Sequence, residues 1–362
     1  MKVINRWSKT ILVLLLISVV EVNSVIGQTF ELINTFDIGH GATSLVFTNA
    51  AQDSSYQPLA VGIKNTNGPR WQSQGWIDLR NPLSGNLIRQ YQIGDFVNAM
   101  DYTGRYNGQA NNEKLAVTVS SDALLLDMKT GKVSYMNNPD FSPISAIKFI
   151  SDSLVVFSDL DGTIAVFGTK ENNHVIPLKS EIQRSGSSSP RSLSVQGKYI
   201  YVGALNEIQG WTLPDTSEEW KKVFTVRTPP TENSNARENY VTNSGPSGYL
   251  YSAEADSLTR YDLTTGTDLM SIPMKGWPKS VAIHDSLIAI GTRYDSLYVY
   301  NIDSLEPTYV GNFSSQNYTI SAVAFGSATV IENGVAVRRI LMATASSIGK
   351  IEVWKYMPTV SD

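Results

Sequence analysis

The chain has 362 residues, of which 42% are hydrophobic and 17% charged, a balance typical of a globular protein with a sizeable core and not of a disordered chain. The 29 basic and 33 acidic residues are scattered and give a net charge of -4, so no basic stripe indicates a nucleic-acid partner. Because cysteine is absent, disulfides, thiolate metal sites and cysteine nucleophiles are excluded.

The N-terminal segment has the composition of a secretory signal. Three basic residues, Lys2, Arg6 and Lys9, precede the apolar run 11–20. A membrane-spanning helix needs about 20 apolar residues, and this run is about half that length. We therefore predict a signal peptide over residues 1–27, export to the periplasm or the medium, and no membrane span after its removal. An uncleaved anchor and a buried N-terminal helix are the alternatives.

From residue 28 onward the sequence predicts strands. Short runs rich in Val, Ile, Leu, Tyr and Thr alternate with polar residues, and turn-forming Gly, Asn, Asp, Ser and Pro separate them. Almost no stretch has apolar residues at helical spacing. Because no linker divides the chain, we predict a single all-β domain over residues 28–362.

One strand recurs at intervals of about 46 residues, a period typical of four-stranded propeller blades. Each copy ends in an aromatic or large apolar residue followed by a small or polar one. In chain order the seven copies are 75–79, 124–128, 164–168, 208–212, 259–263, 298–302 and 352–356. A buried second strand, such as 59–62, and an innermost strand, such as 44–47, precede the copies. The repeat predicts a seven-bladed β-propeller.

The two chain ends predict how the ring closes. The seventh copy ends near Met357, five residues before the last residue, so its blade lacks an outer strand. An additional strand over 30–38 precedes the first blade. We predict that this N-terminal strand completes the last blade, because closure removes the unpaired edges that favour aggregation.

The repeat resembles that of WD-repeat and related seven-bladed propellers. Their Gly-His before the inner strand is present once, as Gly39-His40, and their Trp-Asp only in the degenerate forms Ile77-Asp78, Leu126-Asp127 and Tyr261-Asp262. The segments 126–132 and 261–266 also resemble the Asp-x-x-Thr-Gly turns of bacterial quinoprotein-like propellers. The resemblance covers nearly all of the chain after residue 27 and implies the propeller superfamily.

The sequence predicts no metal site and no cofactor. The three histidines, His40, His174 and His284, are far apart in the repeat, whereas metal sites and histidine-based triads concentrate such groups. The run 158–162 resembles part of a calcium loop, but Phe157 occupies the first ligand position and no bidentate glutamate follows, so a hairpin turn is favoured. No set of basic, carboxylate and aromatic residues of the kind that holds a quinone can be mapped.

Long connections identify a candidate binding face. In a four-stranded meander, the turns between second and third strands and the connections between blades emerge at the same end of the ring. Exposed Trp, Tyr and Arg dominate interface energetics, and loops on a rigid scaffold often carry function. The opposite end has its own excursions, 103–113 and 328–338, so the choice of face is itself a hypothesis. The candidate binding residues are Arg70, Trp71, Arg237, Tyr240 and Trp277.

Two functions are open at this stage. The first is an exported, non-catalytic binding or scaffold propeller that recognises a protein or a glycan. The second is a secreted enzyme, either a quinoprotein-like oxidoreductase or a glycan-cleaving enzyme whose paired carboxylates come from distant blades. Converging carboxylates, or an Arg and Lys pair with a bound ion in the channel, would favour the enzyme. A channel lined by small and apolar side chains would favour the binding protein.

Overall fold

The computed structural model of the chain describes residues 29–49, 55–65, 74–105, 113–120, 122–136, 142–170, 175–176, 178–182, 189–213, 220–228, 238–243, 248–294, 296–312 and 318–358. In these ranges the regular structure is almost entirely β, apart from one 3-10 turn, η2 (Thr103–Arg105). They contain no helix long and apolar enough to cross a membrane. The predicted signal peptide, residues 1–27, lies outside the described residues.

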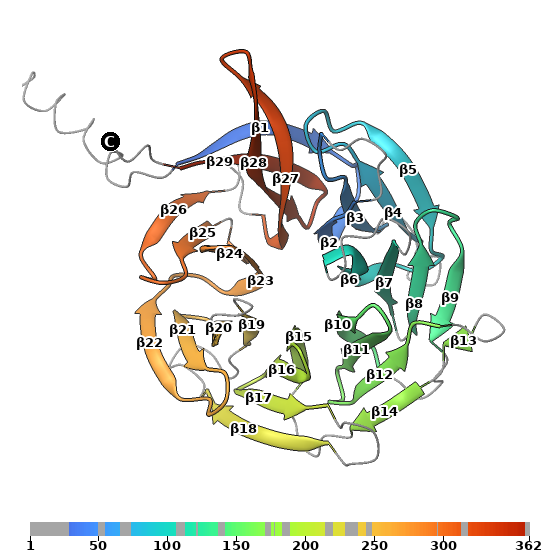
Figure 1. Cartoon of the computed structure of the whole chain (residues 1–362), viewed down its shortest axis with the longest axis vertical. Helices are drawn as coiled ribbons and strands as arrows, with labels where there is room; N and C mark the ends of the chain where they lie inside the picture. Colours follow the sequence, from blue (N-terminus) through green and yellow to red (C-terminus); the bar gives the residue numbers. More distant parts are fainter. Residues whose placement is uncertain are drawn as a thin grey trace, which may run out of the picture.

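Seven blades surround a central axis, each a four-stranded antiparallel meander that runs from an innermost to an outermost strand (Figure 1). Blade 1 contains β2 (Gly41–Phe47), β3 (Leu59–Lys64), β4 (Gly75–Arg80) and β5 (Leu87–Gln92). Blade 2 contains β6 (Val97–Tyr102), β7 (Lys114–Val119), β8 (Asp122–Asp127) and β9 (Val133–Met136). Blade 3 contains β10 (Ile144–Ser151), β11 (Leu154–Asp159), β12 (Ile164–Gly168) and β14 (Leu178–Ile182).

The remaining blades follow the same order. Blade 4 contains β15 (Pro190–Gln196), β16 (Tyr199–Ala204), β17 (Glu207–Thr212) and β18 (Lys221–Arg227). Blade 5 contains β19 (Tyr240–Asn243), β20 (Tyr249–Ala253), β21 (Ser257–Asp262) and β22 (Asp268–Pro273). Blade 6 contains β23 (Pro278–His284), β24 (Leu287–Thr292), β25 (Ser296–Asn301) and β26 (Pro307–Asn312). A short strand, β13 (Val175–Ile176), adds in parallel to β9 at the outer edge of blade 2.

Blade 7 joins the two ends of the chain. It contains β27 (Ile320–Glu332), β28 (Val335–Ser346), β29 (Lys350–Met357) and, as its outermost strand, β1 (Thr29–Asp37). β1 pairs with β29 in an antiparallel register, and the ring of Phe30 lies 5.3 Å from that of Tyr356. The predicted seven-bladed ring and its closure by the N-terminal strand are therefore confirmed.

The hydrophobic core consists of clusters between neighbouring blades. Seven such clusters are present among the described residues, one at each blade boundary. Middle strands contribute most of them, since all six residues of β24 are buried whereas the outer strand β22 has no buried residue. This difference arises because neighbouring blades cover a middle strand on both faces. Buried tyrosine hydroxyls also donate hydrogen bonds to backbone carbonyls of the next blade. These bonds run from Tyr91 to Met128, from Tyr201 to Leu263 and from Tyr251 to Ile302.

The first two strands of blade 7 are longer than the others and extend as a hairpin that projects from the ring (Figure 1). The predicted excursion 328–338 is this hairpin. Its turn contains Asn333 and Gly334, both with positive φ (50° and 78°), as a tight two-residue turn between antiparallel strands requires. We call this end of the ring the hairpin face, and the end that carries the blade-to-blade connections the connection face.

Candidate functional site

An irregularity in the inner strands places one residue of each blade at the channel. In six blades the register between the first and second strands shifts at the same level near the connection face, which leaves one residue outside the ladder. In blade 5, Tyr240 begins the inner strand at this level. The seven residues that line the channel here are Thr43, Asn98, Ser145, Arg191, Tyr240, Lys279 and Ser321.

Three of these residues join neighbouring blades by hydrogen bonds. Their side chains are short, and each donates a hydrogen bond to a backbone carbonyl at the start of the next blade. Such bonds satisfy buried carbonyls that the register shift would otherwise leave without a partner. The bonds run from Thr43 to Val97, from Asn98 to Ile144 and from Ser321 to Ala42, across 2.5, 3.3 and 2.5 Å.

In blades 4 and 6 the next residue along, a serine, makes the bonds to the neighbouring blade. Ser192 donates to a carbonyl of blade 5 across 3.2 Å and accepts from an amide of that blade across 2.8 Å. Ser280 accepts from an amide of blade 7 across 2.9 Å. Within the described ranges, the larger residues that precede these serines, Arg191 and Lys279, make no hydrogen bond to the backbone of a neighbouring blade.

Arg191, Tyr240 and Lys279 instead gather around one carboxylate, Glu238, in the connection that leads into blade 5. The ammonium of Lys279 lies 2.7 Å from the carboxylate, the Nε of Arg191 lies 3.4 Å from it, and the hydroxyl of Tyr240 donates to it across 3.5 Å. Burial, and then the charge of Glu238, raise the pKa of Tyr240 well above its ordinary value. The phenol therefore stays protonated at neutral pH and can donate a hydrogen bond.

A second ion pair lies deeper in the channel. Lys148 on β10 contacts Asp101 on β6, with 3.1 Å between the ammonium and the carboxylate. The other oxygen of Asp101 accepts from the backbone amide of Phe149 across 2.9 Å. The carboxylate is buried, so these partners offset the cost of removing its charge from water.

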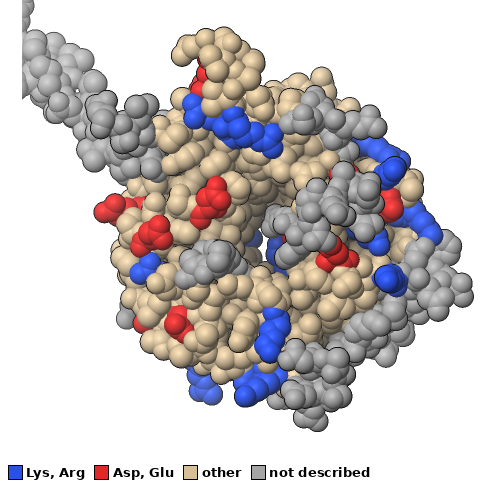
Figure 2. All heavy atoms as spheres, viewed as in Figure 1, with Lys and Arg blue, Asp and Glu red and all other residues tan. Residues whose placement is uncertain are grey.

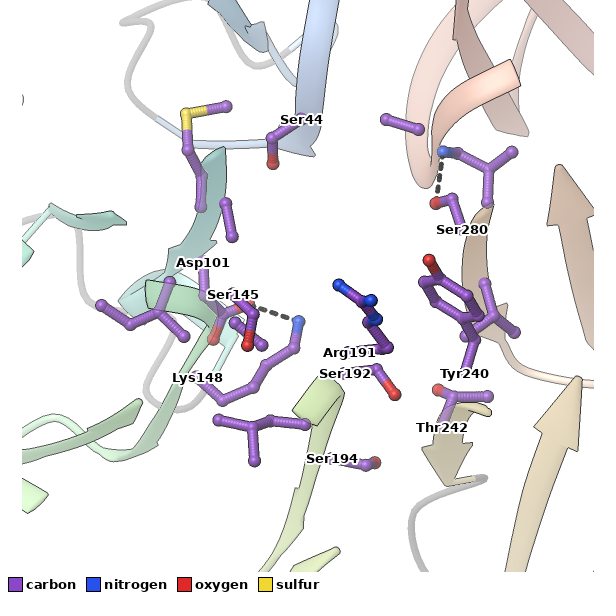
Figure 3. Close-up of a pocket in the computed structure, with 18 of the residues that line it drawn as sticks. Ser44, Asp101, Ser145, Lys148, Arg191, Ser192, Ser194, Tyr240, Thr242 and Ser280 are labelled. Carbon is purple, nitrogen blue, oxygen red and sulfur yellow. Dashed lines mark hydrogen bonds and ion pairs between the residues drawn. The ribbon is translucent and has the colours of Figure 1, made fainter. Parts of the chain in front are cut away.

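The channel forms two adjoining cavities. The cavity at the connection face, which we call the upper cavity, has a volume of about 410 Å³ and is lined by the inner strands of all seven blades. Figure 3 shows the ends of Lys148, Arg191 and Tyr240 directed into this space, with several serine hydroxyls on its walls. The second cavity, about 280 Å³, adjoins it toward the hairpin face and shares Asp101 and Lys148 with it. A cavity of the first size can hold a small ligand or one unit of a larger one.

An aromatic patch lies beside the mouth of the channel on the connection face. It comprises Trp277, Arg293 and Tyr294, and Trp277 lies two residues before Lys279. Trp277 is 37% exposed and Tyr294 is 58% exposed. The guanidinium of Arg293 lies 5.4 Å from the ring centroid of Trp277 and 5.9 Å from that of Tyr294, which orders the three side chains.

Charged side chains near the channel are mainly basic. In the view of Figure 2, basic atoms are visible within the central opening, whereas acidic side chains lie on the surrounding blades. Of the charged residues that line the upper cavity, Lys148, Arg191 and Lys279 are cationic and Asp101 is anionic. With Glu238 included, one positive charge remains in excess in the described part of the chain.

The structure places two of the five predicted binding residues. Tyr240 lines the channel, and Trp277 lies in the aromatic patch beside its mouth. Arg70, Trp71 and Arg237 lie outside the described residues. The binding role of all five stays a prediction.

Sequence reasoning missed Arg191, Glu238 and Lys279. Arg191 and Lys279 follow Pro190 and Pro278, and each is the second residue of its inner strand. Alignment of the seven inner strands at this position would have shown two basic residues and one tyrosine beside four small polar residues. In the sequence these residues lie far apart, each at the end of its own loop, whereas the repeat brings them to one ring.

The other sequence candidates have structural explanations. His40 packs edge-on against Trp76 with 4.9 Å between ring centroids, and His284 stacks on Phe325 at 6.0 Å. The run 158–162 includes the turn between β11 and β12, in which the amide of Thr163 donates to Asp159. Within the described ranges, no three His, Asp or Glu residues gather as they would around a metal ion. His174 lies outside those ranges.

The Asp-x-x-Thr-Gly segments are turns between third and fourth strands, on the hairpin face. In the first, Asp127 accepts from the amide of Thr130, and Gly131 has a φ of 78°. In the second, Asp262 accepts from the amides of Thr264 and Thr265. Blades 1 and 6 have the same turn with Asn81 and Asn301 in the first position. Side-chain capping of a tight turn therefore accounts for the motif.

Comparisons with known proteins leave the family of this chain open. No family model matches it, and no curated protein matches it. The propeller ring is thus shown by the structure alone, and the likeness to WD-repeat or quinoprotein-like propellers stays a resemblance.

Proposed function

We propose that the chain is an exported, non-catalytic binding propeller that recognises a protein or glycan partner through its connection face. The observation that carries this proposal is the position of the aromatic patch beside the channel mouth, where Arg191, Tyr240 and Lys279 converge. Ordered aromatic and arginine side chains on a rigid scaffold lose little conformational entropy on binding and are typical of binding hot spots.

The channel supports binding more directly than catalysis. It contains both basic and small polar side chains, and the two carboxylates found at it among the described residues, Asp101 and Glu238, belong to separate ion pairs with Lys148 and Lys279. A glycan-cleaving site needs two carboxyl groups at either side of one scissile bond. The arrangement around Glu238 instead offers hydrogen-bond donors to a bound molecule.

Affinity capture with the purified chain 28–362 tests the proposal. The double variant Trp277→Ala/Tyr294→Ala removes the exposed part of the patch. The matched control, Ile331→Ser/Val335→Ser, changes two residues of the projecting hairpin that are 71% and 61% exposed on the opposite face. We expect the patch variant to lose most of the partner that the wild type recovers and the control to retain it. Equal recovery by the patch variant and the wild type would overturn the connection face as the binding surface.

A further inference from the structure

We propose that the upper cavity binds the carboxylate of an acidic sugar, a uronic acid unit at the end or edge of a glycan, with Arg191 as its principal partner. This inference rests on the proposed function, because the cavity opens within the same face. It goes further by assigning the charge and the chemical class of the ligand.

The donors of Arg191 are the first reason. Its guanidinium makes no hydrogen bond within the described part of the chain, and its Nε atom is buried without a hydrogen-bond partner. The contact with Glu238 is at ion-pair distance only. Figure 3 shows the guanidinium directed into the cavity. A planar group with five donors at a half-buried position is suited to a carboxylate, which can accept two parallel hydrogen bonds.

The charge balance is the second reason. Glu238 offsets one of the two cations beside it, Arg191 and Lys279, and Asp101 offsets Lys148 deeper in the channel. Among the described residues one positive charge is therefore uncompensated, and a single carboxylate would neutralise it. A phosphate monoester carries a second negative charge, which would be left without a partner in a confined cavity.

The walls of the cavity are the third reason, and they favour a sugar over an acidic peptide side chain. Hydroxyl groups line the space around Arg191, and the phenol oxygen of Tyr240 also faces it. A volume of about 410 Å³ is larger than a carboxylate needs and leaves room for a ring with its own hydroxyls. Trp277, two residues before Lys279 on the same face, offers an exposed aromatic surface on which the apolar face of a sugar ring can pack. The hydroxyls are contributed by Ser44, Ser145, Ser192, Ser194, Thr242 and Ser280.

Calorimetric titration in low-salt buffer tests this assignment with three probes: glucuronate, glucose and N-acetylglutamate amide. Glucose lacks the charge, and N-acetylglutamate amide carries the carboxylate on a peptide-like frame. We expect the wild type to bind glucuronate about tenfold or more tightly than glucose, because a hydrogen bond to a charged group contributes at least this factor. Binding of N-acetylglutamate amide as tightly as glucuronate would overturn the sugar assignment.

Two substitutions at the site should change affinity in opposite directions. Arg191→Gln should weaken glucuronate binding about tenfold or more, because it removes the charged donor. Glu238→Gln should tighten it severalfold, because it removes the carboxylate that competes for Arg191 and Lys279. Arg227→Gln, at an exposed position on the outer strand of the same blade, is the matched control and should bind as the wild type does.

The outcomes separate this inference from the proposed function. Unchanged binding by Arg191→Gln, or weaker binding by Glu238→Gln, would overturn the carboxylate site. A gain in affinity for Glu238→Gln cannot result from misfolding, so the test holds even if Arg191→Gln is unstable. If the wild type does not bind glucuronate but Trp277→Ala/Tyr294→Ala still loses its partner, the carboxylate site is refuted and the binding face stands.

Discussion

At the scale of single residues, small and large side chains of the inner strands have different roles. Short polar residues such as Thr43 and Ser321 join neighbouring blades through their backbone carbonyls. Ser192 joins blade 4 to blade 5 from the position after Arg191. Because Ser192 and Ser280 make the bonds to the backbone of the next blade, the positions before them, Arg191 and Lys279, can carry a basic side chain at the channel. The candidate site therefore occupies positions where the scaffold tolerates function.

Asp262 gives a prediction for pH dependence at this scale. Hydrogen bonds from Thr264, and then from Thr265, lower the pKa of Asp262 from 3.8 to about 2. A lowered pKa means that the charged form stabilises the fold, that this contribution is complete above about pH 4, and that it is lost as the pH falls through about 2. We expect Asp262→Asn to reduce the free energy of unfolding at neutral pH by about 0.5 kcal/mol, a small effect because solvent screens the exposed carboxylate.

Urea unfolding at several pH values measures this effect. The difference between Asp262→Asn and the wild type should shrink as the pH falls from about 4 toward about 2. Asp268→Asn, at an exposed position on the next strand, serves as the control and should show little difference at any pH. A difference for Asp262→Asn that is equally large at both ends of this range would contradict the account.

The residues of the site were harder to predict than the strands that carry them. The alternation of apolar and polar residues correctly indicated inner strands such as 44–47, because burial has a period of two in a strand. A register shift adds a residue and moves later side chains to the other face. It has no composition signal of its own, so the sequence did not show that Arg191 and Lys279 face the channel.

At the scale of elements, the projecting hairpin of blade 7 needs contacts that hold it against the ring. A two-stranded ribbon is marginally stable by itself in water. Here an ion-pair network ties it to the ring, because Glu332 near its tip contacts both Arg339 on β28 and Lys355 on β29. Lys355 also contacts Glu31 on β1, at 2.8 Å. These contacts lower the pKa of Glu332 to about 2, with the hydrogen bond from Arg339 as the largest cause.

Removing this anchor should loosen the hairpin and leave the ring intact. We expect Glu332→Gln to speed amide hydrogen exchange over residues 329–337 severalfold, because solvent-exposed pairs contribute modestly and mainly locally. Amides of the middle strands, such as those of β24, should exchange at the wild-type rate. Glu306→Gln, an exposed glutamate elsewhere, is the matched control. Unchanged exchange in the hairpin of Glu332→Gln would show that the network does not hold it.

The elements themselves were largely predictable. All seven copies of the third strand appear in the structure, because strand periodicity and turn residues agree along the chain. The excursion 328–338 was predicted, and its hairpin form could also have been, since Asn333-Gly334 between alternating residues is a strong hairpin signal. The strand β13 could not, because its parallel pairing with β9 depends on a long-range contact and involves two residue pairs.

At the scale of the whole molecule, stability depends on closure. Each hydrophobic cluster lies between two blades, so an open ring would expose the apolar faces at its break. The pairing of β1 with β29 closes the ring without disulfides, in a chain that has no cysteine. The channel exists only because all seven inner strands surround it, and the proposed site therefore depends on the same closure.

A designed disulfide tests closure most directly. Glu31 and Lys355 are paired residues of β1 and β29. Because the chain has no cysteine, Glu31→Cys/Lys355→Cys would contain a single pair of thiols. We expect this variant to form the disulfide on mild oxidation and to melt at a higher temperature, because the bond closes a very long loop. Glu31→Cys/Lys221→Cys, with its second thiol on the outer strand of blade 4, should keep both thiols free. Two free thiols in the folded Glu31→Cys/Lys355→Cys protein would contradict the closed ring.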